Sequence, residues 1–200
     1  MVVEKNKMKI LPIGDFVYVE IEREEENVVK LPNGKELWLD TSYDRYVNAR
    51  QYGIVKMVSI NINKRVEDNL TLKEGDKVYF HHHCIDEKMS SSFGGENIYK
   101  VHYDQLYCYV RDGKITMLQD YVFVEPIQLE DKIGNIYIQS KESTKRGRVK
   151  FCNQFSKDDG FKNGDEILFI KNANYDMIIE GEKLFRMKNN EILALTTGIE

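Results

Sequence analysis

Four stretches of this sequence recur in the same order along the chain. The offset between copies falls from 105 residues at the first pair to 86 at the last, so the second copy has shorter loops. A repeated unit constrains the fold more than any single motif. We predict two homologous domains, residues 8–111 and 114–200, joined at Arg111-Asp112-Gly113. The matched stretches are 9–20 with 114–125, 53–56 with 147–150, 72–80 with 161–169, and 104–109 with 190–195.

Each copy has the residue pattern of β structure. Phe16–Val19 and Tyr121–Val124 are runs of β-branched and aromatic residues, which favour strands. Lys77–Phe80 and Glu166–Phe169 follow Gly-Asp turns, where glycine supplies a positive φ. No segment has a sustained helical period. The predicted fold class is therefore all-β, with two tandem small β-barrels that hide their strand edges by closing.

Composition limits the class of protein. Hydrophobic residues make up 42% of the chain, enough to bury a core, and no apolar run approaches the roughly 20 residues of a membrane-spanning helix. The net charge of −4 opposes nucleic-acid binding, which needs a basic face. The three cysteines form no CxxC pair, and residues 1–7 carry no apolar signal core. We expect a cytoplasmic protein without nucleic-acid or membrane partners.

The order of the motifs resembles the GroES-type co-chaperonin family, in two tandem passes over nearly the whole chain. That family has an opening I-x-P-L-x-D-x-V-x-V strand, a long loop with an apolar triplet, then G-x-V, G-D-x-V-x-F and a closing E-I-L-A strand. The second copy is the nearer match, with Asp120, Val122, Val124, Ser143–Val149, Gly164–Phe169 and Glu191–Ala194. The first copy keeps Ile10, Pro12, Asp15, Val17, Val19, Gly53, Val55, Gly75, Asp76, Val78 and Phe80.

The resemblance implies a lid rather than a catalyst. Members of the family cap the ATP-bound cage of a GroEL-type chaperonin while an unfolded client protein folds inside. They act as rings, usually sevenfold, in which terminal strands of neighbouring subunits pair. No cofactor and no metal is implied. A composition rich in Lys, Asn and Tyr suits a phage member acting in the host cytoplasm, with a viral capsid protein as client.

Two apolar triplets are the candidate chaperonin-binding residues. The first is Leu37, Trp38 and Leu39, flanked by Lys35, Glu36 and Asp40. The second is Ile136, Tyr137 and Ile138, which follows Gly134-Asn135. In the family, such a triplet on a flexible loop docks between two apical helices of the chaperonin. The alternative is that each triplet is an ordinary strand, with Trp38 and Tyr137 in the core.

Other clusters have simpler interpretations. On a strand, His81 and His83 share one face while His82 points to the other, so a metal would need a further ligand such as His102 or Asp86. Exposed or stacked histidines are the default. Lys141, Lys145, Arg146, Arg148 and Lys150 form a basic stretch, which an alternating solvated strand face explains without nucleic acid.

No enzymatic signature is present: the sequence contains no GxSxG, GxxxxGK[ST], GxGxxG or HExxH. We therefore expect a protein that is not an enzyme. Two functions remain open. The first is a co-chaperonin acting as a homo-oligomeric ring, although whole two-domain chains do not tile seven positions. The second is a structural or assembly protein that reuses the same barrels without a chaperonin.

Overall fold

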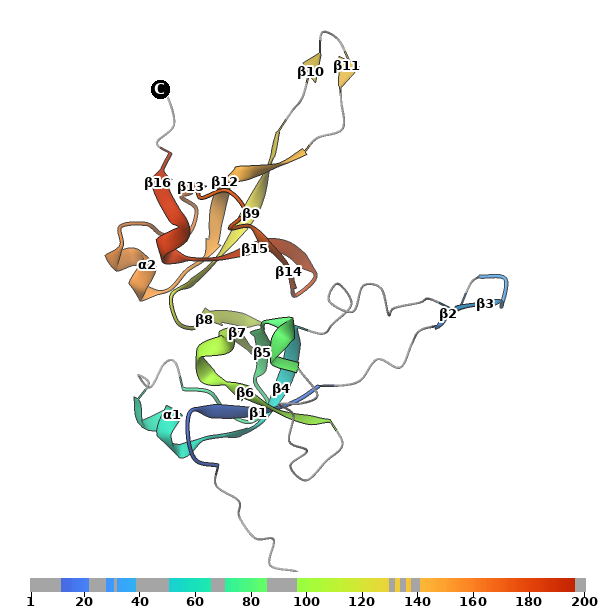
Figure 1. The fold of residues 1–200 in the computed structure, drawn as a ribbon, viewed down its shortest axis with the longest axis vertical. Helices are drawn as coiled ribbons and strands as arrows, with labels where there is room; N and C mark the ends of the chain where they lie inside the picture. Colours follow the sequence, from blue (N-terminus) through green and yellow to red (C-terminus); the bar gives the residue numbers. More distant parts are fainter. Residues whose placement is uncertain are drawn as a thin grey trace, which may run out of the picture. The chain divides into compact units, whose positions relative to one another are not determined.

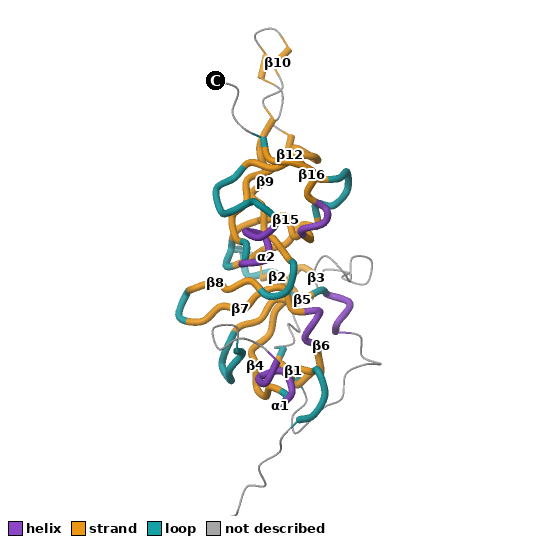
Figure 2. Tube along the Cα trace, turned by 90° about the vertical axis from the view of Figure 1, so that its left-hand side faces the viewer, coloured by secondary structure: helices purple, strands orange, loops and turns teal. Residues whose placement is uncertain are grey.

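The structure, a computed structural model, describes residues 12–21, 28–30, 32–38, 51–65, 71–85, 97–129, 132–133, 136–137 and 141–196. Strands dominate these residues and the helices are few and short, as Figure 1 and Figure 2 show. The all-β fold class is confirmed. Contacts divide the chain into two units, Met1–Leu106 and Tyr107–Glu200. This division falls inside a strand, a few residues before the predicted joint.

The first six-stranded sheet has the order β6-β1-β4-β5-β7-β8. The strands β7 and β8 form a hairpin in which Arg111 pairs with Lys114. The two residues between them, Asp112 and Gly113, have φ of 50° and 74°, the left-handed pair that a tight two-residue hairpin turn requires. The strands of this first sheet are β1 (Phe16–Glu20), β4 (Tyr52–Val58), β5 (Lys77–Phe80), β6 (Ile98–His102), β7 (Leu106–Arg111) and β8 (Lys114–Met117). The short helices between them are α1 (Ile60–Arg65), η2 (His82–Ile85) and η3 (Tyr103–Gln105).

The second six-stranded sheet has the order β14-β15-β9-β12-β13-β16. Its core is a cluster of buried side chains that includes Val122, Val149, Ile167 and Phe185. Its strands are β9 (Tyr121–Leu129), β12 (Lys141–Phe151), β13 (Glu166–Phe169), β14 (Tyr175–Ile179), β15 (Glu182–Lys188) and β16 (Ile192–Leu195); its helices are α2 (Gln154–Asp158) and η4 (Asn189–Glu191). Two further strand pairs belong to neither sheet: β2 (Val28–Lys30) with β3 (Glu36–Trp38), and β10 (Lys132–Ile133) with β11 (Ile136–Tyr137).

Five strands follow the same order in both sheets. The run β6-β1-β4-β5-β7 of the first corresponds to β15-β9-β12-β13-β16 of the second. The register also agrees: Gly53 faces Val78 on β5, and its counterpart Gly147 faces Ile167 on β13. The sequence repeat is therefore also a repeat of strand order and strand register.

A β-bulge with an ion pair recurs at the same place in each unit. The β1–β4 pairing shifts between Tyr18 and Val19, and the β9–β12 pairing shifts between Val149 and Phe151. The residue at the shift is a lysine in both copies. The Nζ of Lys56 lies 2.6 Å from Glu20 Oε2, and that of Lys150 lies 2.5 Å from Glu125 Oε1. Bulges change the direction in which side chains point. In each unit the bulge directs the lysine towards the equivalent glutamate on the neighbouring strand.

Glycine is required where the first two strands of each unit approach. A Cβ on Gly53 would lie 2.9 Å from the carbonyl oxygen of Glu20, and a Cβ on Gly147 would lie 2.9 Å from that of Glu125. Real Cβ atoms essentially never come this close to another heavy atom, and the neighbour here is backbone that has no other rotamer. The glycine shared by both copies is thus explained by packing rather than by a turn.

We predict that Gly147→Ala destabilises the second unit by about 1–3 kcal/mol, because the methyl group overpacks the β9–β12 crossing. Hydrogen exchange should show faster exchange of β9 and β12 amides, with no change in β1 and β4. The matched variant Gly53→Ala should speed exchange of the β1 and β4 amides and leave those of β9 and β12 unchanged. Lys145→Ala, at an exposed position of β12, is the control and should change neither. Equal exchange in wild type and Gly147→Ala would contradict this account.

Candidate functional site

The first predicted triplet lies on a small strand pair of its own. Strand β2 (Val28–Lys30) pairs with β3 (Glu36–Trp38), with Val29 opposite Leu37. The exposed turn between them has Gly34 at φ 77°, and the Lys35 amide donates to Asn33 Oδ1 at 3.1 Å. This is an Asx-type turn in which asparagine and glycine have the roles that their chemistry favours.

The second triplet lies on the other small pair. Strand β10 (Lys132–Ile133) pairs with β11 (Ile136–Tyr137), with Ile133 opposite Ile136. In Figure 1 this pair stands beyond the end of the β9–β12 ladder, at which Leu129 pairs with Lys141. The predicted loop is therefore the connection between the first two long strands of the second unit.

The backbone position of the triplets is partly settled. Leu37, Trp38, Ile136 and Tyr137 are strand residues of the two small pairs, outside the six-stranded sheets. Leu39 and Ile138 lie outside the described residues. The alternative interpretation predicts a strand for each triplet, with Trp38 and Tyr137 in the core of its domain. The strands are present, but they do not belong to the six-stranded sheets. The docking role of all six residues stays a prediction.

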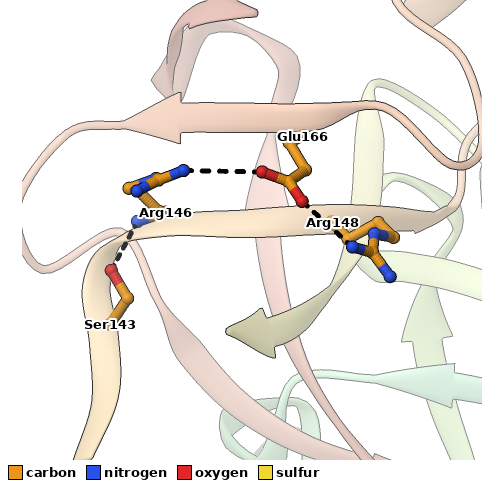
Figure 3. A network of polar contacts seen from close by, with 4 residues as sticks. All are labelled: Ser143, Arg146, Arg148 and Glu166. Atoms are coloured by element: carbon orange, nitrogen blue, oxygen red, sulfur yellow. Dashed lines mark hydrogen bonds and ion pairs between the residues drawn. The ribbon is translucent and has the colours of Figure 1, made fainter. Parts of the chain in front are cut away.

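The basic stretch on β12 is paired with acidic side chains. Figure 3 shows Glu166 of β13 between the guanidinium groups of Arg146 and Arg148, at 3.5 and 3.0 Å. Ser143, also in Figure 3, is buried and accepts a hydrogen bond from the Arg146 amide at 3.0 Å. Lys150 contacts Glu182 at 3.1 Å as well as Glu125. Arg146, Arg148 and Lys150 are therefore each paired with a glutamate, as an alternating strand face open to solvent predicts.

These pairs shift the pKa values of the groups that form them. The hydrogen bond from Arg148 lowers the pKa of Glu166 below its ordinary value, and the charges of both arginines add to this. Hydrogen bonds to Glu125 and Glu182 raise the pKa of Lys150. Both side chains are partly exposed, at 34% each, so solvent screens the pairs, and they organise the strand face more than they stabilise the fold.

The histidine cluster ends a strand rather than continuing it. Strand β5 stops at Phe80, and His82 begins the 3-10 turn η2. The rings of His81 and His83 stack with centroids 4.8 Å apart, and the His83 amide donates to His81 Nδ1 at 3.2 Å. The strand geometry assumed for these residues is wrong, whereas the stacking expected of them is present. Asp86 lies outside the described residues, and among those described no group of three His, Cys, Asp or Glu could hold a metal ion.

The cysteines lack the features of an activated nucleophile. Burial raises the pKa of Cys84 to about 11, so its thiol is protonated at neutral pH. Burial also raises the pKa of Cys152, whose Sγ donates to Asn163 Oδ1 at 3.0 Å. A reactive thiol needs a lowered pKa, so neither residue is prepared for nucleophilic chemistry.

Sequence reasoning missed an open groove beside β16. The groove has a volume of about 590 Å³. One side is lined by Phe155 and Asp158 of α2 and by Asp159, which follows the helix, and the other side by residues of β16 that include Leu193 and Leu195. Phe155 and Leu193 are 56% and 65% exposed, unusual for large apolar side chains gathered in one place. The Leu-Ala-Leu pattern predicts the strand but not its exposure, which depends on what lies beside it.

Comparison with known proteins identifies the family. The model of the family described as "Chaperonin 10 Kd subunit" matches residues 114–196. The "Co-chaperonin GroES" of Jannaschia sp. (strain CCS1) is 33% identical over 90 residues, which cover 40% of this chain and 95% of that protein. Those of Porphyromonas gingivalis and Geobacter sulfurreducens are each 35% identical, over 86 and 88 residues, covering 40% and 39% of this chain and 97% and 93% of those proteins.

These likenesses define a co-chaperonin rather than a catalyst. The chain belongs to the chaperonin 10 (GroES) family, as its motifs predicted. The family is not enzymatic, so the expectation of a non-enzyme is confirmed. The family match lies within the second unit. In the described part of the chain, no helix is long and apolar enough to cross a membrane.

We predict that Arg148→Ala raises the pKa of Glu166 toward the ordinary glutamate value, because the main hydrogen bond to its carboxylate is lost. A pKa lowered by folding stabilises the fold above the unfolded pKa, and this contribution disappears as the pH falls through the folded value. Carboxyl NMR titration measures the change directly. Lys145→Ala is the control and should leave the Glu166 titration unchanged; a Glu166 pKa that stays low in Arg148→Ala would contradict the assignment.

Proposed function

We propose that this protein is a two-domain co-chaperonin that caps the ATP-bound cage of a GroEL-type chaperonin. The observation that supports this most is the GroES family match over residues 114–196, which includes the connection that carries Ile136 and Tyr137. The relatives are named co-chaperonins, and the name implies a chaperonin partner. Protein folding assistance in the cytoplasm, without a cofactor, follows from that role.

The first unit is proposed as a second GroES-like domain. The shared strand order and register support this, and so do hydrogen bonds that recur between equivalent residues. The Val55 amide donates to Asp76 O at 2.8 Å, and the Val149 amide donates to Asp165 O at 2.8 Å. Each of these aspartates accepts a hydrogen bond from the amide three residues before it, Lys73 or Lys162. Recurrence of this detail is hard to explain unless one ancestral unit was duplicated.

The two small strand pairs are proposed as the chaperonin-contacting elements. In this role Leu37, Trp38 and Leu39 of one pair and Ile136, Tyr137 and Ile138 of the other bury their side chains on the chaperonin. Aromatic residues such as Trp38 are favoured anchors of interfaces. Each contact is weak, because ordering a loop has an entropic cost, and several contacts in one assembly raise the overall affinity. A homo-oligomer of several chains supplies that multiplicity.

The proposed client is a viral capsid protein. A sequence rich in Lys, Asn and Tyr suits a phage protein, and we propose a capsid protein as client in the host cytoplasm. The alternative function is a structural or assembly protein that uses GroES-like domains without a chaperonin. The exposed groove beside β16 is the observation that favours this alternative, because assembly proteins need such docking surfaces.

Capture by an immobilised GroEL-type chaperonin, with and without ATP, tests the proposal. We predict ATP-dependent capture of the full chain. Combined Ile136→Ser and Ile138→Ser substitutions should weaken capture at least tenfold, because the apolar surface that docks is replaced by hydroxyl groups. The pair Leu37→Ser and Leu39→Ser tests the first unit in the same way.

Ile178→Ser is the matched control for this experiment. Ile178 is 68% exposed on β14, so the same substitution there removes exposed apolar surface without touching either triplet. Its capture should equal that of the wild type. Undiminished capture of a chain carrying all four triplet substitutions would refute the docking role, and no capture of the wild type at all would favour the assembly protein.

A further inference from the structure

Two asparagines of this chain are each followed directly by a glycine. The pairs are Asn33-Gly34 and Asn163-Gly164. Because glycine has no Cβ, the amide nitrogen after the asparagine is not shielded by a side chain and can approach other groups closely. That nitrogen can reach Cγ, the carbonyl carbon of the asparagine side chain, and close a succinimide ring. By sequence alone, both pairs are candidates for this reaction.

Exposure and backbone conformation do not distinguish the two pairs. Asn33 and Gly34 are exposed in the turn between β2 and β3, and Asn163 and Gly164 are exposed in the turn before β13. Gly34 has a φ of 77° and Gly164 a φ of 93°. A Cβ added to either glycine would meet no atom within 4 Å. The difference between the pairs lies in their hydrogen bonds.

The second pair is fixed by hydrogen bonds to residues distant in the sequence. Asn163 Oδ1 accepts hydrogen bonds from the Cys152 amide and from Cys152 Sγ, each at 3.0 Å. The Gly164 amide, which would be the nucleophile, donates to the Val149 carbonyl at 2.8 Å. Both reacting groups are therefore held by β12 and the residue that follows it. Ring closure requires this part of the unit to open first.

The first pair is held by a residue of its own turn. Asn33 Oδ1 accepts a hydrogen bond from the Lys35 amide at 3.1 Å, so the side chain is turned forward along the backbone, past Gly34. Among the residues that the structure describes, none accepts a hydrogen bond from the Gly34 amide. The nucleophile and the carbonyl that it attacks thus lie in one exposed turn, and no contact with a sheet separates them.

We propose that Asn33 is a site of spontaneous deamidation, and that the contacts of Asn163 protect it from the same reaction. The Gly34 nitrogen forms a bond to Asn33 Cγ, the bond from Cγ to Nδ2 breaks, and Nδ2 leaves as ammonia with the proton that the Gly34 nitrogen loses. Water then opens the succinimide at either carbonyl, which produces aspartate or isoaspartate. The site does not rest on the proposed function, because the reaction needs nothing beyond this turn and water.

The products change the strand pair that the turn connects. Both add a carboxylate to a turn that already precedes Glu36. Isoaspartate also adds a methylene group to the backbone between Lys30 and Glu36, which pair across β2 and β3. Because loop length sets the register of a hairpin, the isoaspartyl form should lose the pairing of Val29 with Leu37. The β2–β3 pair is therefore expected to change as the protein ages.

Peptide mapping by mass spectrometry tests the proposal on the full chain. The folded protein is incubated in mildly alkaline buffer and sampled over days, and the mass gain from amide to acid is assigned to a peptide. We expect Asn33 to deamidate at least about tenfold faster than Asn163, because the second pair reacts only after local opening. Asn33→Gln has a longer side chain that closes the corresponding larger ring more slowly, so this variant should keep the mass of that peptide unchanged.

The same incubation in urea tests whether the fold causes the difference. Unfolding removes the contacts of Cys152 and Val149 with the second pair, so the two rates should come within about threefold of each other. The inference would be overturned by a folded chain in which Asn33 keeps its amide or in which Asn163 reacts as fast. A rate ratio that unfolding leaves unchanged, or a mass gain in the same peptide of Asn33→Gln, would also overturn it.

Discussion

The close approach of the first two long strands determines much of each unit. Gly53 and Gly147 leave room for the carbonyl oxygens of Glu20 and Glu125, so the two backbones pack at a distance that no other residue permits. Next to this point both pairings shift register, and the lysine at the shift turns to the glutamate on the neighbouring strand. The glycine, the bulge and the ion pair thus lie next to one another on the same two strands. All three recur together in the two copies.

Strand positions could be predicted where local chemistry determines them. Runs such as Phe16–Val19 favour strands in any context, and the Arg111-Asp112-Gly113 joint has the residues that a tight hairpin turn requires. The hairpin of β14 and β15 begins in a part of the second copy without a matched stretch in the first, so the repeat did not predict it. The end of β5 at Phe80, before the histidines, depends on where its neighbouring strands end. Pairing partners, unlike propensities, are not local properties.

The candidate site shows the same division between local and non-local information. The triplets could be recognised because three apolar residues between polar ones are visible in the sequence. Their place on separate small strand pairs could not, because Val29 and Ile133, their cross-strand partners, have no distinctive pattern. The pairing of Arg148 with Glu166 is likewise a consequence of register, and it places a carboxylate beside the basic stretch that the sequence alone does not show.

Two units in one chain limit the rings that whole chains can form. The β7–β8 hairpin joins two strands within one chain, and one of them, β7, occupies the place in the first sheet that β16 has in the second. Because each chain contributes two units, any closed ring of whole chains contains an even number of units. Seven equivalent positions therefore cannot be filled by whole chains in which both units take part.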